Sequence, residues 1–374
     1  MRKALSLMMV LVFAFSFLAA CESGGKTPDG SDVTSDAAAS QTAAAQSSDT
    51  KIGLGLITTI KSSKDLGVDS TGGEVLPLGQ ADTVIVAALF DKDGKVVKAV
   101  IDTVQAKVQF DKDLKITTDF DAPIKTKVEL GIDYNMVKAS VIKKEWFEQA
   151  SALADWMTGK TAAEIKNMKT YEKDASHPAV PDVPELKSAV TITVGDYLAA
   201  LEKAYVNAKA APGAKTLGIG HEISIKSSKS YLKNEDGTEV LPLAQIDAVI
   251  TAVTMDAEGK VAGAIIDTAQ TKIQFDNAGK ITTDKAGAFR SKLELGSEYG
   301  MIRASSIQKD WYQQSESLAG WMNGKTIDEI KAMKTYEKDA SHPAVPDEPE
   351  LKSSVTINVK DYLMAADEAV ANAK

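Results

Sequence analysis

An internal repeat of constant spacing is the feature that most limits the folds open to this chain. The same offset of 165 residues relates Tyr171 to Tyr336 (336 − 171) and Gly53 to Gly218 (218 − 53). An offset that never slips indicates two copies without insertions, each far longer than the roughly 20 to 50 residues of a solenoid repeat. We therefore expect two tandem domains, each long enough to bury a core. Their predicted bounds are 51–208 and 216–374, with a linker at 209–215.

Strand patterns come first within each copy. In the first copy, residues 83–90 are β-branched and apolar, Asp93-Gly94 is typical of a hairpin turn, and residues 96–103 continue as the partner strand. The second copy repeats this pattern at 248–255, Glu258-Gly259 and 261–268. Further short strands are expected at 107–110 and 115–118.

Helical periodicity follows from Lys144, where apolar residues recur at helical spacing. Gly159 is expected to end this helix. The stretches Thr161–Glu164 and Thr326–Glu329 have the residues of a capping box and predict the start of the next helix in each copy.

The end of each copy is expected to form a strand that runs into a terminal helix. In the first copy the strand is predicted at 190–194, and Asp196 is expected to cap the helix, which presents Tyr197 and Leu201 on one side. Together these patterns predict an α+β fold, with an antiparallel sheet in each copy packed by C-terminal helices.

The first twenty residues have the features of an export signal. A short positive region, an apolar run at 5–17 and small residues before Cys21 predict a lipoprotein signal peptide at 1–20 and a lipid such as palmitate on Cys21. A retained membrane helix is the alternative. Residues 21–50, rich in Ser, Ala and Gly, are expected to be the lipid anchor and a flexible tether. We therefore expect an extracytoplasmic protein that is anchored to the cell membrane and exposed at the cell surface.

Cysteine usage and charge exclude several functions. Cys21 is the single cysteine, and the sequence has no CxxC, CxxCH or Cys/His cluster, so it predicts no c-type haem, iron–sulfur or zinc site. The formal net charge is -9, which makes nucleic acid a poor partner. Redox chemistry would therefore need a borrowed cofactor.

A short motif stands before the terminal helix of each copy. Ser188 and Thr191 lie in Glu-Leu-Lys-Ser-Ala-Val-Thr, and Ser353 and Thr356 lie in Glu-Leu-Lys-Ser-Ser-Val-Thr. With the strand pair around a glycine turn, these stretches resemble the pattern D-G-x-[ST]-G-A-T of the FMN-binding domains of exported flavoproteins. Here glutamate stands at the aspartate position, alanine or serine at the glycine, and valine at the alanine.

The resemblance implies a flavin-based electron carrier rather than a catalyst. In that family a threonine carries FMN through a phosphoester that a dedicated flavin transferase forms. The resemblance therefore implies one covalent FMN at Thr191 and one at Thr356, with Ser188 and Ser353 at the hydroxyl position of the motif. A lipoprotein with two such domains is similar to the flavinylated lipoproteins of extracellular electron transfer, and its implied partners are a membrane-bound electron donor and an external acceptor.

The residues around the motif suggest how a flavin could be held. A threonine just before a helix N-terminus lies where N–H groups and the helix dipole favour a phosphate. The flavin ring would need an apolar or aromatic wall. The candidates for this wall are Tyr134, Met136, Trp146 and Trp156 in the first copy and Tyr299, Met301, Trp311 and Trp321 in the second. Trp and Met at helical spacing are also typical of a core.

Other candidate sites give weaker patterns. His177 and His342 lie in a stretch that is identical in both copies, 169–182 and 334–347, and a loop residue is the simpler interpretation. The acidic residues near the first hairpin, Asp91, Asp93 and Asp102, lack the alternating loop and closing glutamate of a calcium site.

Three other functions stay open at this stage. The first is a non-enzymatic surface binding module for a small ligand or an envelope polymer, in which two copies would add avidity. The second is a structural surface protein without a pocket. The third is an envelope hydrolase, which lacks the expected G-x-S-x-G context.

Overall fold

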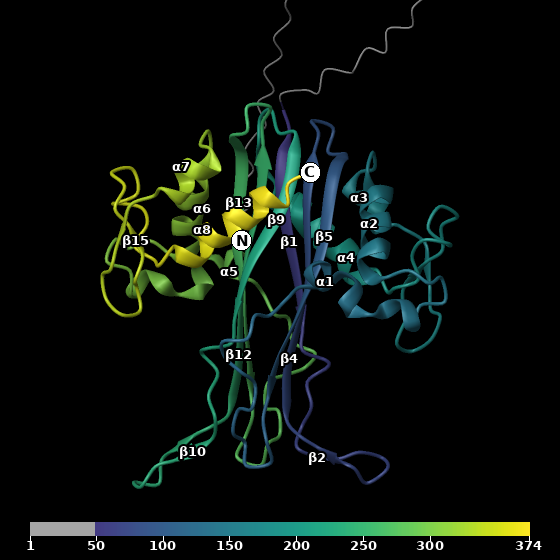
Figure 1. Ribbon diagram of the computed structural model, residues 1–374, viewed down its shortest axis with the longest axis vertical. Coiled ribbons are helices and arrows are strands. Elements are labelled where there is room, and N and C mark those ends of the chain that lie inside the picture. The colour runs from purple at the N-terminus through teal and green to yellow at the C-terminus, as the bar shows by residue number, and fades with distance from the viewer. Residues whose placement is uncertain (1–48) are drawn as a thin grey trace, which may run out of the picture. The chain divides into compact units, whose positions relative to one another are not determined.

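Each copy of the repeat folds into long antiparallel strands followed by helices, and the second copy repeats the elements of the first at the same offset (Figure 1). The structure is a computed structural model that describes residues 49–374, which belong to one compact unit. The first copy contains β1 (Lys51–Thr59), β2 (Gly67–Val68), β3 (Glu74–Val75), β4 (Leu78–Phe90), β5 (Val96–Gln109), α1 (Lys127–Leu130), η1 (Gly131–Tyr134), η2 (Met136–Lys138), α2 (Trp146–Met157), α3 (Ala162–Lys166), β6 (Thr170–Tyr171), β7 (Val180–Pro181) and α4 (Gly195–Val206).

The strand β8 (Lys209–Ala210) follows, and then the second copy. Its elements are β9 (Thr216–Ser224), β10 (Leu232–Lys233), β11 (Glu239–Val240), β12 (Leu243–Met255), β13 (Val261–Gln274), α5 (Lys292–Leu295), η3 (Gly296–Tyr299), η4 (Met301–Arg303), α6 (Trp311–Met322), α7 (Ile327–Lys331), β14 (Thr335–Tyr336), β15 (Val345–Pro346) and α8 (Lys360–Ala371). The predicted α+β class with antiparallel sheets is confirmed.

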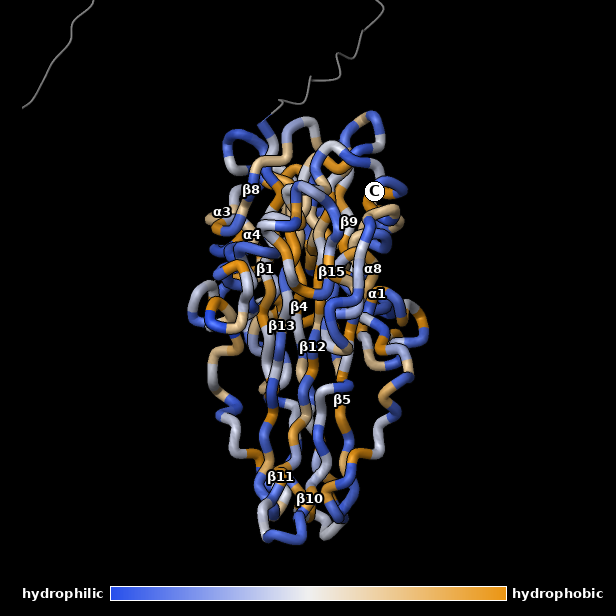
Figure 2. The backbone as a smooth tube through the Cα atoms, turned by 90° about the vertical axis from the view of Figure 1, so that its left-hand side faces the viewer, coloured by the Kyte–Doolittle hydropathy of each residue, from blue (hydrophilic) through white to orange (hydrophobic). Residues whose placement is uncertain are grey.

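The two sheets pack face to face between two sets of helices (Figure 1). The strand order is β5-β4-β1-β8 in one sheet and β13-β12-β9 in the other. Side chains from the inner faces of both sheets, among them Ile85 and Ile250, form one shared core. The outer face of each sheet carries a separate core with the helices of its own copy. Figure 2 shows hydrophobic stretches along the central strands and mainly hydrophilic loops at the ends.

Contacts between the copies continue beyond the helices, at the far ends of the long hairpins. The rings of Phe110 and Phe275 lie across the interface with centroids 5.2 Å apart. Beside them, Ile281 donates its N–H to Asp65, and Ile116 donates its N–H to Ser230, so each copy holds a loop of the other. The copies are therefore joined along most of the length of their strands.

Glycines let the terminal helix of each copy lie directly on its sheet. In β1, Ile52 and Leu54 face the shared core, while Gly53 and Gly55 face α4. A Cβ atom on Gly55 would lie 1.9 Å from the carbonyl oxygen of Ala200. No side chain fits at that separation, and α8 lies equally close to the matching glycines of β9.

The segment predicted as a linker is part of the packed structure. Lys209 and Ala210 pair with the first residues of β1, and Ala211 and Ala214 are buried in the shared core. The connection between the copies therefore adds an edge strand to the first sheet.

Several predicted element bounds are corrected. The segments 96–103 and 107–109 belong to one strand, β5, while Phe110 forms an isolated bridge with Ile116 of the segment 115–118. Residues 190–194 form no strand in the described structure, because their backbone groups find partners elsewhere: Thr191 N–H donates to a side chain and Val194 N–H to the carbonyl of Ala179. Asp196 lies in the first turn of α4 but does not cap it, since the N-cap residue is Val194.

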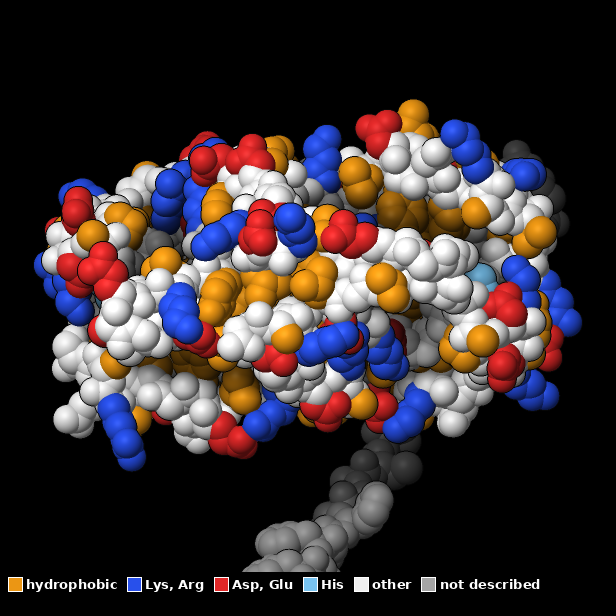
Figure 3. Space-filling model, turned by 90° about the horizontal axis from the view of Figure 1, so that it is seen from below, with side chains coloured by type: hydrophobic (Ala, Val, Ile, Leu, Met, Phe, Trp, Pro, Cys, Tyr) orange, Lys and Arg blue, Asp and Glu red, His pale blue; other side chains and the backbone are white. Residues whose placement is uncertain are grey.

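The predicted hairpin turns and capping boxes are confirmed. Gly94 and Gly259 occupy their turns with positive φ, and Thr161 and Thr326 form the capping boxes of α3 and α7. On the face seen in Figure 3, basic and acidic side chains are interspersed around apolar patches. This face therefore carries no large field of a single sign.

Candidate functional site

Thr191 lies half-buried in the irregular segment between β7 and α4. Its N–H donates to Oε1 of Gln149 at 2.8 Å, and its Oγ1 lies 3.3 Å from the same oxygen. Thr356 makes the same two contacts with Gln314, at 2.8 and 3.4 Å. In both copies a buried glutamine of the long helix thus holds the threonine that the motif selects.

Each threonine borders a pocket, and the two pockets are equivalent. The first has a volume of about 380 Å³ and the second about 410 Å³. The first is lined by Tyr171, Val180, Pro181, Asp182, Lys187, Val190 and Thr191. The second is lined by Tyr336, Pro346, Asp347, Lys352, Val355 and Thr356. Every residue of the second set is the repeat partner of an identical residue in the first.

A lysine and an aspartate give each pocket its charge. Lys187 Nζ lies 3.0 Å from Asp182 Oδ1, and Lys352 Nζ lies 2.9 Å from Asp347 Oδ1. All four side chains are substantially exposed, so these ion pairs contribute little stability in water. The ammonium groups can therefore turn to an anion in the pocket at small cost.

The aromatic residues that the sequence suggested for a flavin-binding wall do not line the described pockets beside the threonines. Trp146 is buried and donates its Nε1–H to the hydroxyl of Tyr197 at 3.2 Å, as Trp311 does to Tyr362 at 2.9 Å. The other candidates, Tyr134, Met136 and Trp156 with Tyr299, Met301 and Trp321, pack against the same helical cores. None of these eight is among the residues that line the described pockets beside the threonines.

Tyr171 and Tyr336 are the aromatic residues beside the threonines, and the sequence used them only to measure the repeat. Both rings are about half exposed at 46%. The sequence contains a pattern that could have identified these tyrosines. The stretches 169–182 and 334–347 are identical, and they supply the tyrosine, proline and aspartate of each pocket.

Ser188 and Ser353 lie in exposed turns, three residues before the threonines, and are not among the described lining residues. The N-terminus of α4 also contributes no lining residue in the described structure. Lys187 is thus the cationic side chain that lines the pocket beside Thr191, where the sequence suggested a helix N-terminus.

His177 and His342 lie in exposed loops and make local contacts. His177 Nδ1 lies 2.8 Å from Asp174 Oδ1 and 3.1 Å from Ser176 Oγ. Hydrogen bonds from Ser176 and His177 hold the pKa of Asp174 well below its usual range. A catalytic triad needs the two ring nitrogens to face serine and aspartate separately. Here one nitrogen faces both, and the same geometry recurs at His342, so neither loop forms such a triad.

The three aspartates near the first hairpin are separated. Asp91 accepts the N–H groups of Asp93 and Lys95 and so shapes the turn. Asp102 is buried, and its Oδ1 accepts the N–H groups of Thr103 and Val128. They form no common cation site within the described residues.

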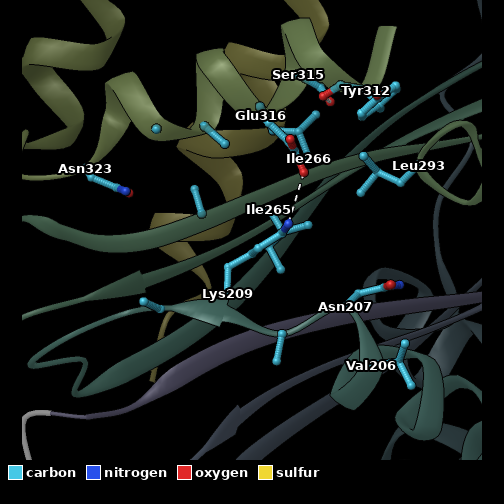
Figure 4. Close-up of a pocket in the computed structure, with 15 residues that line it drawn as sticks. Val206, Asn207, Lys209, Ile265, Ile266, Leu293, Tyr312, Ser315, Glu316 and Asn323 are labelled. Carbon is cyan, nitrogen blue, oxygen red and sulfur yellow. Dashed lines mark hydrogen bonds and ion pairs between the residues drawn. The ribbon is translucent and has the colours of Figure 1, made fainter. Parts of the chain in front are cut away.

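A larger cavity, of about 460 Å³, lies where the linker meets the second copy (Figure 4). Its walls come from the end of α4, β8, β13 and α6, and Lys209 bridges them by an ion pair with Glu316 at 3.0 Å. Because its lining combines the end of the first copy, the linker and the second copy, this cavity is a product of the junction and not a duplicated site.

Replacing Gln149 with leucine tests the hydrogen-bond network that holds Thr191. The substitution removes the acceptor for Thr191 N–H and the donor to the carbonyl of Lys144, at 2.8 and 3.2 Å. We expect the free energy of unfolding to fall by about 2 kcal/mol, because buried polar groups lose their partners. Urea unfolding measures this. Gln314→Leu is the internal replicate, and a loss below about 0.5 kcal/mol in both variants would show that the network is not needed.

Cys21 and the predicted signal peptide lie outside the described residues. Within the part of the chain that the structure covers, we find no helix with the length and apolar character needed to cross a membrane.

Comparison with known proteins gives distant similarities. No protein-family model matches the chain. A chlorophenol reductase of Desulfitobacterium hafniense is 33% identical over 102 residues, which cover 24% of this chain and 31% of that protein. This chain thus matches about a third of that relative's length. The neutral ceramidase of Pseudomonas aeruginosa and a ceramidase complex with C2 are similar over 58% of this chain and about 30% of theirs, at 12% and 13% identity, with TM-scores of 0.16 and 0.18. Scores this low carry no argument about fold or function.

Proposed function

We propose that this protein is a membrane-anchored, extracytoplasmic electron carrier that holds one covalent FMN in each copy, at Thr191 and Thr356. The observation that carries the proposal is the pair of equivalent pockets, each bordered by one of these threonines and lined by identical residues. The two copies differ at many other positions, but these six lining residues are the same in both, as a shared ligand would require.

The pocket residues are compatible with the cofactor. Volumes of about 380 and 410 Å³ fall in the range of about 300 to 1,000 Å³ that is usual for small-molecule sites. Lys187 offers a cation for the phosphate, and Tyr171 offers a ring face for the flavin. Bound FMN would supply the electron transfer, since the side chains of the pocket have no redox group.

The departures from the family motif also fit the backbone. Ala189 and Ser354, at the glycine position, are not among the described residues with positive φ. Glycine is therefore not required there by backbone conformation. Val190 and Val355, at the alanine position, are buried in the helical cores. The altered motif thus packs without strain around the threonine.

The chain itself would position the cofactor and leave bond-making chemistry to other proteins. Gln149 accepts the backbone N–H of Thr191 and so holds that backbone in place. The attachment point of a covalent FMN on Thr191 would therefore be fixed. The lipid on Cys21 and the tether 21–50 would keep the copies near a membrane-bound donor and within reach of an external acceptor. One relative is named as a reductase, and the proposal rests on the pockets and not on that name.

Intact mass of protein co-exported with a flavin transferase tests this function. We expect two added FMN units in the unchanged chain, one in Thr191→Ala, one in Thr356→Ala and none in the double variant. Thr193→Ala is the matched control, because Thr193 lies two residues from Thr191 but outside the pocket lining and has Asn358 as its repeat partner. An unmodified, colourless chain would refute the carrier and favour the binding module, with the two equivalent pockets as its sites.

A further inference from the structure

The two halves of the interface between the copies differ in one cluster of titratable side chains. His221, on β9, is only 9% exposed. Its Nε2 lies 2.8 Å from Oε2 of Glu129, which belongs to the first copy, and its Nδ1 lies 3.3 Å from Oε1 of Glu368 on α8. One ligand atom from each of the three residues lies within 4.8 Å of the others.

The repeat supplies an internal comparison for this cluster. The offset of 165 residues relates Glu129 to Glu294 and Glu368 to Lys203. At that equivalent place, Lys203 Nζ lies 2.5 Å from Glu294 Oε1 and donates to the carbonyl of Leu56 at 2.9 Å. Leu56 is in turn the repeat partner of His221. One half of the interface thus has a built-in cation beside its glutamate.

The other half of the interface has no lysine at this place and has potential metal ligands instead. Where Lys203 stands in the first copy, the second has the carboxylate of Glu368, and where Leu56 faces the shared core, the second has an imidazole. The carboxylates of Glu129 and Glu368 face the two ring nitrogens of the buried His221. An imidazole nitrogen between carboxylate oxygens is a ligand set that suits a metal cation.

The geometry points to a divalent transition-metal site, with Zn²⁺ as the probe, that joins the two copies through Glu129 and His221. Nitrogen and carboxylate oxygen are suitable ligands for Zn²⁺, with bonds of about 2.0 to 2.2 Å. Bonds of this length place neighbouring ligand atoms about 3.4 Å apart in a tetrahedron. The observed 2.8 Å between His221 Nε2 and Glu129 Oε2 requires only a small opening.

Glu368 has a supporting position in this site. It accepts the backbone N–H of His221 at 2.7 Å and lies beside Nδ1 of the same residue. A proton on Nδ1 leaves the lone pair of Nε2 free for the metal, which is the carboxylate–histidine–metal arrangement found in many zinc sites. Glu368 is therefore a positioning residue, and Glu129 and His221 are the direct ligands, with solvent completing the coordination on the exposed side.

Calorimetric titration of the chelator-treated full chain with Zn²⁺, purified without a histidine tag, tests the site. We expect one Zn²⁺ per chain and a rise in the thermal unfolding midpoint with Zn²⁺ concentration. Glu129→Gln should weaken binding at least tenfold, and Glu368→Gln by about 10- to 100-fold, as for other partners of ligating histidines. Co²⁺ in place of Zn²⁺ should give visible absorption bands that Glu368→Gln shifts, since a purely structural role would leave them unchanged.

The repeat provides a variant that should fold without the site. The double variant His221→Leu with Glu368→Lys copies Leu56 and Lys203 of the other half, so the interface regains an ion pair while the ligands are lost. We expect native unfolding behaviour and no binding at the 1:1 site. His177→Ala with His342→Ala is the second control, because these loops each hold a histidine 2.8 Å from an aspartate. The proposal would be overturned if the unchanged chain did not bind Zn²⁺ or if His221→Leu with Glu368→Lys bound it as well as the unchanged chain. Loss of Zn²⁺ binding in His177→Ala with His342→Ala would also overturn it.

Discussion

Alanine at Gly55 is expected to lower the free energy of unfolding by about 3 kcal/mol or more. The added Cβ would lie 1.9 Å from the carbonyl oxygen and 2.9 Å from the carbonyl carbon of Ala200, and 2.7 Å from the backbone nitrogen of Ala204. All three atoms belong to the backbone of α4, so no rotamer change can make room. Either α4 moves away from β1, which opens the first helical core, or β1 shifts within its sheet. Urea or thermal unfolding measures the loss.

Gly320→Ala is the matched control for this prediction. Gly320 lies in α6, and a Cβ atom there would meet no atom within 4 Å. Alanine should therefore raise stability by up to about 1 kcal/mol through helix propensity. Similar small effects of both substitutions would show that α4 is not packed directly on β1.

The free energy of unfolding is expected to fall as pH rises from about 4 to above 6, because of two buried aspartates. Burial raises the pKa of Asp102 to about 6 and that of Asp267 to about 6, from 3.8. Below pH 4 both carboxyls are protonated in the folded and unfolded chain, and their contribution to stability is fully present. Between pH 4 and 6 the unfolded chain loses these protons first, so stability falls, and above pH 6 the loss is complete. Each group accounts for about 3 kcal/mol.

The double variant Asp102→Asn with Asp267→Asn isolates this effect. Asparagine keeps an oxygen that can accept the N–H groups of Thr103 and Val128, or of Thr268 and Leu293 in the second copy, but has no charge to desolvate. We expect the difference in stability between variant and unchanged chain to grow by about 6 kcal/mol between pH 3.5 and pH 7.5. Parallel pH profiles for the two proteins would show that these carboxyls are not desolvated.

Local sequence patterns predicted the turns and helix starts of this fold better than they predicted how the two sheets pack together. The hairpin turns at Gly94 and Gly259 and the capping boxes at Thr161 and Thr326 depend on neighbours in the chain, and all four are observed. The failed strand at 190–194 had the right residue types. Its N–H groups donate instead to the side chain of Gln149 and to the carbonyl of Ala179, which lie outside the local strand pattern.

The shared core between the copies was the main feature that local patterns did not give. The run 83–90 is apolar on both faces, as in strands that are covered on both sides. The constant offset indicated two tandem domains but left open whether they pack together, because an offset measures duplication and not packing. The buried alanines of the linker, Ala211 and Ala214, follow from the same contact between the sheets.

For the candidate sites too, local sequence patterns predicted single residues but not the contacts between residues that are distant in sequence. The motif selected Thr191 and Thr356, and each is found beside a pocket. The prediction of the aromatic wall was wrong, because Trp146, which lies at helical spacing, is buried in the core instead. The cluster of Glu129, His221 and Glu368 joins residues 92 and 147 positions apart. Such separations leave no pattern in a sequence scan for metal ligands.

Peptide mapping of the chain co-exported with a flavin transferase tests the central claim most directly. Cleavage after lysine releases 188–203 and 353–360, each with one candidate threonine. We expect FMN on both peptides, with fragment masses that assign it to Thr191 and Thr356 and to none of Ser188, Thr193 or Ser353. Both peptides free of flavin, or flavin attached at another residue, would contradict it.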